Sequence, residues 1–326
     1  MAFKKAKAEQ AYLKIGIYGP PGSGKTFTAL LCAEGLAAKS KKRIAFVDTE
    51  RGTDFYAQTI KDRAVHPDAF DFDAIYTRSI TDVLADVKAL DCSQYNVVVI
   101  DSITHLWEST KQAYAGKMTR AGTIPFTAWG TIKKPYKELM TLLLNMPAHV
   151  FILGRQGNEF DEDETTGELK KVGVKMKAEG ETPYEPHILL CMEAVRGKDD
   201  SFTPTVTVDK DRTGILAGKT FRNPTYADLI APLTSYLGDT QAKMATEEET
   251  GQRDAEVLGN EEAAKANYSA EQVREFVARF DLAKTSAEVD AVGKLITADL
   301  KKKMIPQDVD ALRDKFHEST TRTKGR

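Results

Sequence analysis

Short apolar runs alternate with segments of helical periodicity along the first two thirds of the chain. The run from Val97 to Ile100 has no polar position, as expected of a strand that is covered on both faces of a sheet. Strands that alternate with helices indicate βαβ units and a mostly parallel sheet. The predicted strands span residues 14–19, 43–48, 95–101, 149–155, 188–195 and 203–208, and the predicted helices span residues 26–39, 81–90 and 126–146.

The pattern changes in the last third of the chain. An α/β core is predicted over residues 13–238, and the polar, Glu-rich residues 239–267 predict a flexible acidic linker. Ser269 is expected to be the N-cap of a helix, three residues before Gln272, because apolar positions at helical spacing follow it. We therefore expect a small helical bundle over residues 268–318. A basic, disordered tail at residues 319–326 and a flexible Lys-rich leader at residues 1–12 complete the prediction.

Composition narrows the class of protein. The formal net charge of -2 over 326 residues excludes a polybasic nucleic-acid binder of the histone kind and leaves only local basic patches. The 3 cysteines lack C-x-x-C spacing, which argues against a disulfide framework and a structural zinc site and fits a reducing cytosol. No apolar run is long enough for a signal peptide or a bilayer span. A cytoplasmic protein without membrane contact is expected.

One motif predicts nucleotide binding. Residues 19–26 form an unbroken G-x-x-x-x-G-K-[ST] phosphate loop between a predicted strand and a predicted helix. Its glycines let backbone N–H groups approach phosphates, and the positive end of the following helix favours an anion. We expect ATP and Mg²⁺ as ligands, with Lys25 on the β- and γ-phosphates and the Thr26 hydroxyl on the metal. The predicted nucleotide contacts are Gly19, Pro20, Pro21, Gly22, Ser23, Gly24, Lys25, Thr26 and Phe27.

Two carboxylates follow other predicted strands. Asp101 ends an apolar strand, the place of a Walker B aspartate that holds Mg²⁺ directly or through water. Glu50 follows the predicted strand at residues 43–48, where a carboxylate can orient or deprotonate the attacking water. Glu50 is the predicted catalytic base, and the presence of Ser102 rather than Glu after Asp101 is consistent with this role. The alternatives are an Asp that only caps a strand end and a solvated Glu that caps a helix.

The run Asp48-Thr49-Glu50 resembles the RecA family, whose eukaryotic and archaeal recombinases carry D-T-E-G-T-F at this place. Lys210 and Arg212 resemble the K-N-R-F-G element of RadA-type proteins and the K-x-R pair of KaiC-like ATPases. In those families the two cations face the γ-phosphate of a neighbouring subunit, and strand alternation puts both on one side. The resemblance implies catalytic roles for Lys210 and Arg212 in a homo-oligomer, a ring or a filament. A solvated strand end with alternating charges is the alternative.

The resemblance also implies a γ-phosphate sensor at Gln156 that passes its signal to a DNA-binding loop. Residues 157–180, predicted to be a projecting hairpin or a mobile loop, take the place of the second DNA loop, and residues 114–122 take that of the first. Ordinary solvated loops explain both segments equally well, and the acidic run at residues 159–164 weakens the basic-patch argument. The candidate DNA contacts are Lys117, Arg120, Lys170, Lys171, Lys175 and Lys177.

Residues 14–238 resemble RecA-like phosphate-loop ATPases encoded by bacteriophages, in particular the Sak-type single-strand annealing proteins. This resemblance implies a RecA-like α/β fold and a DNA-stimulated ATPase that acts on single-stranded DNA in phage recombination, annealing or replication, in the cytoplasm of a bacterial host. Two other functions stay open. One is a hexameric motor or helicase loader of the same fold. The other is a nucleotide-dependent switch or scaffold that binds a protein partner through the C-terminal bundle.

Overall fold

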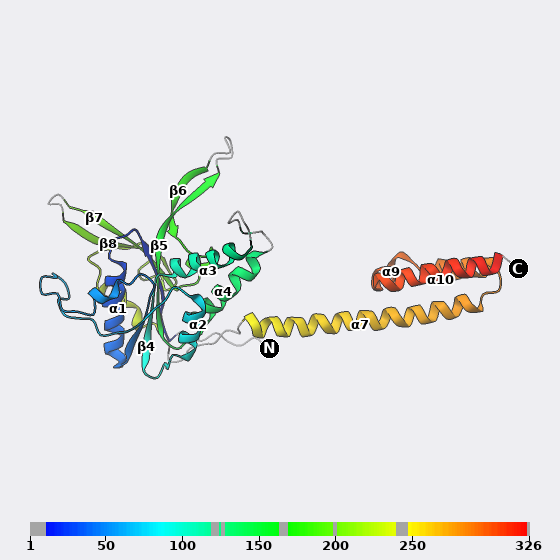
Figure 1. Ribbon diagram of the computed structural model, residues 1–326, viewed down its shortest axis with the longest axis horizontal. Helices are drawn as coiled ribbons and strands as arrows, with labels where there is room; N and C mark the ends of the chain where they lie inside the picture. Colours follow the sequence, from blue (N-terminus) through cyan, green and yellow to red (C-terminus); the bar gives the residue numbers. More distant parts are fainter. Residues whose placement is uncertain are drawn as a thin grey trace. The chain divides into compact units, whose positions relative to one another are not determined.

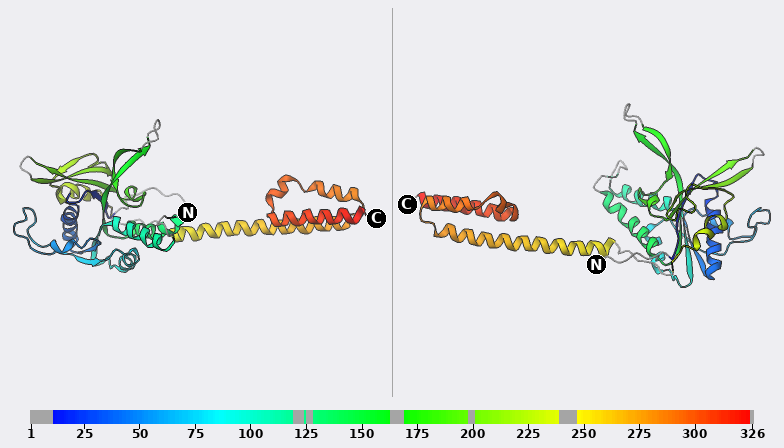
Figure 2. Two further views of the ribbon diagram at one scale, coloured as in Figure 1. Left: turned by 45° about the horizontal axis from the view of Figure 1, so that its top comes forward. Right: turned by 180° about the vertical axis from the view of Figure 1, so that it is seen from behind.

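The computed structural model describes residues 11–118, 124, 128–162, 169–197, 201–238 and 247–324. The chain divides into two compact units, Met1–Met244 and Ala245–Arg326, and each is described by itself (Figures 1 and 2). Within the described ranges, none of the helices combines the length and the apolar character that a bilayer span requires.

A nine-stranded sheet forms the centre of the first unit (Figure 1). Its strands are β1 (Lys14–Gly19), β2 (Arg43–Asp48), β3 (Asp73–Tyr76), β4 (Tyr95–Asp101), β5 (His149–Glu162), β6 (Leu169–Met176), β7 (Ile188–Arg196), β8 (Phe202–Asp211) and β9 (Thr220–Arg222). The order is β3-β2-β4-β5-β1-β7-β8-β9, and β6 pairs with β5 off this path. The pairs from β3 to β7 are parallel, whereas β6, β8 and β9 join the sheet in antiparallel pairs.

Helices cover both faces of this sheet. They are α1 (Lys25–Ser40), α2 (Ile80–Ala89), α3 (Ile103–Met118), α4 (Trp129–Asn145), α5 (Tyr226–Leu229) and α6 (Ala231–Thr234). Val97 and Val99 of β4 belong to the apolar core under α1, and Val98 and Ile100 belong to the core under α2, α3 and α4. A strand whose alternate side chains enter two cores must be apolar throughout. The predicted α/β core with a mostly parallel sheet is confirmed.

β5 and β6 form an antiparallel hairpin that projects beyond the body of the sheet (Figures 1 and 2). Its ladder pairs Gln156 with Met176 at the base and Glu162 with Leu169 farther out. Phe160 and Leu169 are exposed on this arm. The strand that was predicted to end at residue 155 therefore continues into the hairpin, because the polar residues after it still pair through their backbones.

Over residues 247–324 the second unit contains four helices, and its start differs from the prediction. They are α7 (Glu247–Leu282), α8 (Ser286–Leu295), α9 (Ala298–Lys303) and α10 (Pro306–Lys324). The prediction of a flexible linker is wrong for residues 247–267, which belong to α7, since Glu and Ala have a high intrinsic preference for the helix. Ser269 is not an N-cap. It lies inside α7, and its hydroxyl accepts a hydrogen bond from the Ile305 backbone N–H at 3.1 Å.

The C-terminal helical bundle is confirmed, and it is longer than predicted. Phe276, Phe280, Val289 and Leu312 are buried in its apolar core. The prediction of a disordered tail is wrong as far as Lys324, because α10 continues to that residue. Arg322 explains this extension. Its Nη2 donates hydrogen bonds to the backbone carbonyls of Phe280 (2.7 Å) and Ala283 (3.0 Å) and so caps the C-terminal end of α7.

Candidate nucleotide-binding site

The phosphate loop joins β1 to α1 with a backbone that requires its glycines. Gly22 and Gly24 have φ angles of 75° and 91°, in the left-handed region where glycine pays no steric penalty. A Cβ atom on Gly19 would lie 2.1 Å from the carbonyl oxygen of Met192 in β7. The loop can therefore close against the sheet only with glycine at this position.

The polar groups of the loop fit an anion. The first turn of α1 contains no acidic residue and no side chain caps it, so its backbone N–H groups keep their partial positive charge for a ligand. The Ser23 hydroxyl is buried without a hydrogen-bond partner among the described residues. Lys25 Nζ donates to the carbonyl oxygens of Gly19 (3.0 Å) and Pro20 (2.9 Å), and burial lowers the pKa of this amine. Phosphate oxygens would satisfy all of these donors.

Phe27, a predicted nucleotide contact, packs against its own chain. Its ring centroid lies 5.7 Å from that of Phe70 and 6.3 Å from that of Tyr56, and the Arg63 guanidinium lies 5.7 Å from the Phe27 ring. These contacts hold the loop of residues 51–72 beside α1. A contact between Phe27 and the nucleotide stays a prediction.

The two predicted metal ligands are neighbours. Thr26 Oγ1 donates a hydrogen bond to Asp101 Oδ2 at 2.5 Å. Burial raises the pKa of Asp101 to about 6, although the hydrogen bond from Thr26 opposes this shift. A hydroxyl oxygen and a carboxylate oxygen beside the phosphate loop are ligands of the kind that Mg²⁺ prefers. The pair therefore fits a Mg²⁺ ion.

The chain after β2 is folded around Asp48. This buried carboxylate accepts hydrogen bonds from the backbone N–H groups of Glu50 and of two following residues, at 2.7–3.1 Å. Thr49 Oγ1 accepts a hydrogen bond from the Ser102 backbone N–H at 2.8 Å. Because Asp48 and Asp101 are paired in the β2–β4 register, the turn after β2 lies next to the end of β4. The local fold thus places Glu50 at the edge of the sheet where Asp101 lies.

One oxygen of Glu50 accepts hydrogen bonds from several donors. Arg155 lies 3.1 Å away through Nε and 3.0 Å away through Nη2, and the Ser102 hydroxyl donates at 3.3 Å. His105 Nδ1 lies 3.8 Å from the same Oε1 atom, and burial lowers the pKa of this histidine. Thr49 Oγ1 contacts the same Nδ1 at 2.8 Å. Hydrogen bonds from two segments of the chain, at Arg155 and Ser102, therefore orient the predicted catalytic carboxylate.

Arg155 is the contact that the sequence did not predict. The sensor was placed at Gln156, but successive side chains of β5 point to opposite sides, and Arg155 is the one that reaches Glu50. The Arg155 backbone N–H donates to Thr104 Oγ1 at 2.9 Å, and its carbonyl accepts from the Lys177 N–H at 2.7 Å. The amide oxygen of Gln156 is buried and has no partner among the described residues. A sensor role for Gln156 stays a prediction.

Two of the candidate DNA contacts are engaged in ion pairs. Lys177 Nζ lies 2.6 Å from Glu108 Oε1 of α3, and Lys175 Nζ lies 3.6 Å from Glu159 Oε1 on the facing strand of the hairpin. The signal for the second pair was in the sequence, since the first part of the acidic run, residues 159–162, lies in the partner strand. These pairs reduce the positive charge that Lys175 and Lys177 offer to phosphates.

The remaining four candidate DNA contacts lie in other parts of the chain or outside the described residues. Lys170 and Lys171 are exposed on β6, in the projecting hairpin. Lys117 lies in α3 and not in the loop that was predicted, because this helix continues to Met118. Arg120 lies outside the described residues. DNA binding by these residues stays a prediction.

Lys210 and Arg212 converge on one atom. Lys210 Nζ donates to the Tyr184 carbonyl oxygen at 2.5 Å, and Arg212 Nη2 donates to the same oxygen at 3.2 Å. Burial lowers the pKa of Lys210, and the positive charge of Arg212 lowers it further. Within the described residues, neither cation hydrogen-bonds to the phosphate loop, Glu50 or Asp101. The two cations therefore lie side by side without reaching the site of their own chain.

Comparisons with known proteins place this geometry in a family. A search of curated proteins found no significant match. Among solved structures, the chain is similar to the RadB recombinase at 19% identity, over 66% of this chain and 87% of that one, with a TM-score of 0.41. It is also similar to a KaiC-like protein from the archaeon Pyrococcus horikoshii OT3 at 16% identity, over 65% and 85%, with a TM-score of 0.41. Residues 11–200, more than half of the chain, match the family described as AAA domain, and the chain belongs to this family of phosphate-loop proteins.

Proposed function

We propose that this chain hydrolyses ATP and that Glu50 is its general base. The observation that carries the proposal is the place of the Glu50 carboxylate, which accepts a hydrogen bond from Ser102, the residue after Asp101. The negative charge of Glu50 also raises the pKa of Lys25 and the pKa of Asp101, against the larger effect of burial on Lys25 and in addition to it on Asp101. A carboxylate next to the phosphate and metal ligands can take the proton of an attacking water.

The roles of the other residues follow from their positions. Lys25 and the first-turn N–H groups of α1 would hold the phosphates. Thr26 and Asp101 would hold Mg²⁺, which neutralises charge on the phosphates when it is bound. Glu50 accepts the proton of the water that attacks the γ-phosphate, and Arg155 keeps its carboxylate in one orientation.

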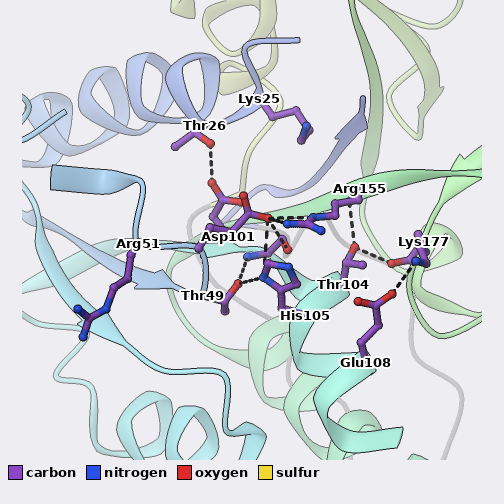
Figure 3. A network of polar contacts seen from close by, with 12 residues as sticks. Lys25, Thr26, Thr49, Arg51, Asp101, Thr104, His105, Glu108, Arg155 and Lys177 are labelled. Atoms are coloured by element: carbon purple, nitrogen blue, oxygen red, sulfur yellow. Dashed lines mark hydrogen bonds and ion pairs between the residues drawn. The ribbon is translucent and has the colours of Figure 1, made fainter. Parts of the chain in front are cut away.

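In this proposal Arg155, rather than Gln156, responds to the γ-phosphate. Its side chain is 49% exposed and extends toward Asp101 (Figure 3). A guanidinium carries five N–H donors, so two can stay on Glu50 while others bind a phosphate oxygen. Because Arg155 lies where the β5–β6 hairpin leaves the sheet, it connects the site to that arm.

The test is a comparison of three single variants in steady-state ATP turnover and in binding of a fluorescent ATP analogue. Glu50→Gln should slow turnover by about 10² or more and leave binding nearly unchanged, because an amide cannot accept the proton. Lys25→Ala should lose binding itself. The control is Glu138→Gln, the same change on α4, where the carboxylate pairs with Lys88. Normal turnover in Glu50→Gln would refute its role as the base.

We also propose that the active form is a homo-oligomer, a ring or a filament. The support is the convergence of Lys210 and Arg212 on the Tyr184 carbonyl, while neither has a hydrogen bond to the phosphate loop, Glu50 or Asp101 in the part of the chain that the structure describes. Two adjacent cations suit the developing charge of a phosphoryl group that a neighbouring copy binds.

Single-stranded DNA is the proposed partner, in phage recombination or annealing within the host cytoplasm. Support comes from the exposed Lys170 and Lys171 and from the exposed ring of Phe160 on the same hairpin, since cations and aromatic faces bind single strands. ATP turnover should rise on addition of single-stranded DNA, less so at high salt. A Lys170→Ala/Lys171→Ala variant that keeps the full stimulation would remove the hairpin from the proposal.

A further inference from the structure

The second unit contains a concave apolar surface that its own core leaves open. A cavity of about 570 Å³ lies between α8, the segment after it and α10. Its apolar lining consists of Gly293, Ile296, Val309, Leu312 and Phe316. Leu312 is buried and the other large side chains are only partly buried. The groove therefore offers apolar area that a partner can remove from water.

Gly293 shapes this groove. A Cβ atom at this position would lie 2.7 Å from the Phe316 ring. Without a side chain there, the ring packs against α8 and edge-on to Phe280, with centroids 5.9 Å apart. The ring is held by these contacts, and the aliphatic side chains beside it form the floor of the groove.

The rim of the groove is mostly positive. Lys294, Lys301 and Arg313 line it and are exposed, against one carboxylate, Asp290. Arg313 has an ion-pair partner, Asp310. Lys294 and Lys301 have no ion pair among the described residues. Two unpaired cations beside an apolar floor favour a ligand that is both negative and apolar.

We infer that this groove binds an acidic peptide segment of a partner protein, with a bulky apolar side chain in the cavity and carboxylates on Lys294 and Lys301. A concave pocket that takes one anchor side chain, with charges at its rim, is a common way to bind a peptide. Nucleic acid fits less well, because bases need open aromatic faces and the floor is aliphatic apart from the packed ring of Phe316. The inference does not depend on the proposed ATPase activity.

The experiment uses the full chain and a displayed library of random short peptides. Selection on the immobilised protein should enrich peptides that combine Asp or Glu with Phe, Trp, Leu or Ile. The selected peptide is then labelled, and its affinity is measured by fluorescence anisotropy. Lys294→Glu/Lys301→Glu should weaken binding at least about tenfold. The matched control is Lys284→Glu/Lys303→Glu, the same charge change at two exposed lysines outside the groove.

If the double variant binds no selected peptide, exchanging the charges between peptide and protein distinguishes lost complementarity from misfolding. A peptide whose acids are replaced by lysine should fail on the natural chain and bind Lys294→Glu/Lys301→Glu, provided that circular dichroism shows an unchanged melting curve. Four results would overturn the inference. The selection could enrich peptides without acidic residues, or enrich none. The control variant could lose as much affinity, or a single-stranded oligonucleotide could displace the peptide. The last result would assign the groove to nucleic acid.

Discussion

His149 should make the stability of the core unit sensitive to pH. It is the first residue of β5 and is 8% exposed, and its Nδ1 accepts a hydrogen bond from the Leu13 backbone N–H at 3.0 Å. Burial, together with the smaller effect of the positive charges of Lys14 and Lys39, lowers the pKa of His149 to about 4. A protonated ring cannot accept the bond from Leu13, so the folded state needs the neutral form.

The magnitude follows from the two pKa values. Between pH 6.5 and about 4 the unfolded chain binds a proton at this histidine and the folded chain does not, so stability is complete above pH 6.5 and is lost as the pH falls. At about 1.4 kcal/mol per pH unit, a fall to pH 5 costs about 2 kcal/mol. Protonation of Asp101 has the opposite effect on stability as the pH falls. Its pKa is raised to about 6, so the folded state gains about 1 kcal/mol over the same fall.

The variant His149→Asn measures how much of the pH dependence of stability comes from this histidine. An Asn amide oxygen can replace Nδ1 as the acceptor and does not titrate, while Asp101 contributes equally to both proteins and cancels in the difference. Urea unfolding at pH 7 and pH 5 is followed by fluorescence of Trp107 and Trp129, which both lie in the core unit. The loss of stability should be about 2 kcal/mol smaller in His149→Asn. An equal loss in both proteins would refute the reasoning, and His317→Asn, in the second unit, is the control.

Three further predictions concern the site and the sheet. Arg155→Gln should slow ATP turnover by about 10² and change nucleotide affinity by less than about threefold. The reason is that the donors of Arg155 act on charge that develops in the reaction. A binding titration that shows a change in affinity with normal turnover would contradict this role. Mixing inactive Arg212→Ala with inactive Glu50→Gln subunits should restore part of the turnover, and no recovery in mixtures shown to co-assemble would exclude action between subunits. Burial lowers the pKa of Lys14 to about 7, so the core should gain about 2 kcal/mol from pH 7 to pH 9, a gain that Lys14→Met should lack in urea titrations.

The sequence alone predicted where along the chain Asp101 and Glu50 lie relative to the strands of the sheet. Asp101 and Glu50 follow apolar runs, and parallel neighbouring strands bring their carboxyl ends to one edge. The pairing of β2 with β4 places the two residues together for this reason. The same runs predicted most of the strands, because covered strands have a pattern that polar loops lack. β3 was not predicted, since this edge strand is short and only half buried.

Other features depend on contacts that no local pattern contains. Arg155 and Gln156 are adjacent polar residues directly after the apolar part of β5, and only the register of the strand decides which one faces Glu50. The pair of Lys177 with Glu108 joins segments far apart in the chain. The first part of α7, residues 247–267, has only two large apolar residues, Val257 and Leu258, and the apolar spacing that predicts a helix is weak there; the intrinsic preference of Glu and Ala accounts for this helix.

The ion pair of Glu50 with Arg155 constrains how the site can respond to a phosphate. The Arg155 backbone is hydrogen-bonded on both sides, through its N–H to Thr104 of α3 and through its carbonyl to Lys177, the residue after β6. A slip of β5 would break both hydrogen bonds and shift every pair of the hairpin ladder. Rotation of the guanidinium breaks none of them, so the arginine can turn toward a phosphate while the strand stays in register. In the proposed reaction, the side chain that orients the base can therefore detect the substrate without any change in the fold.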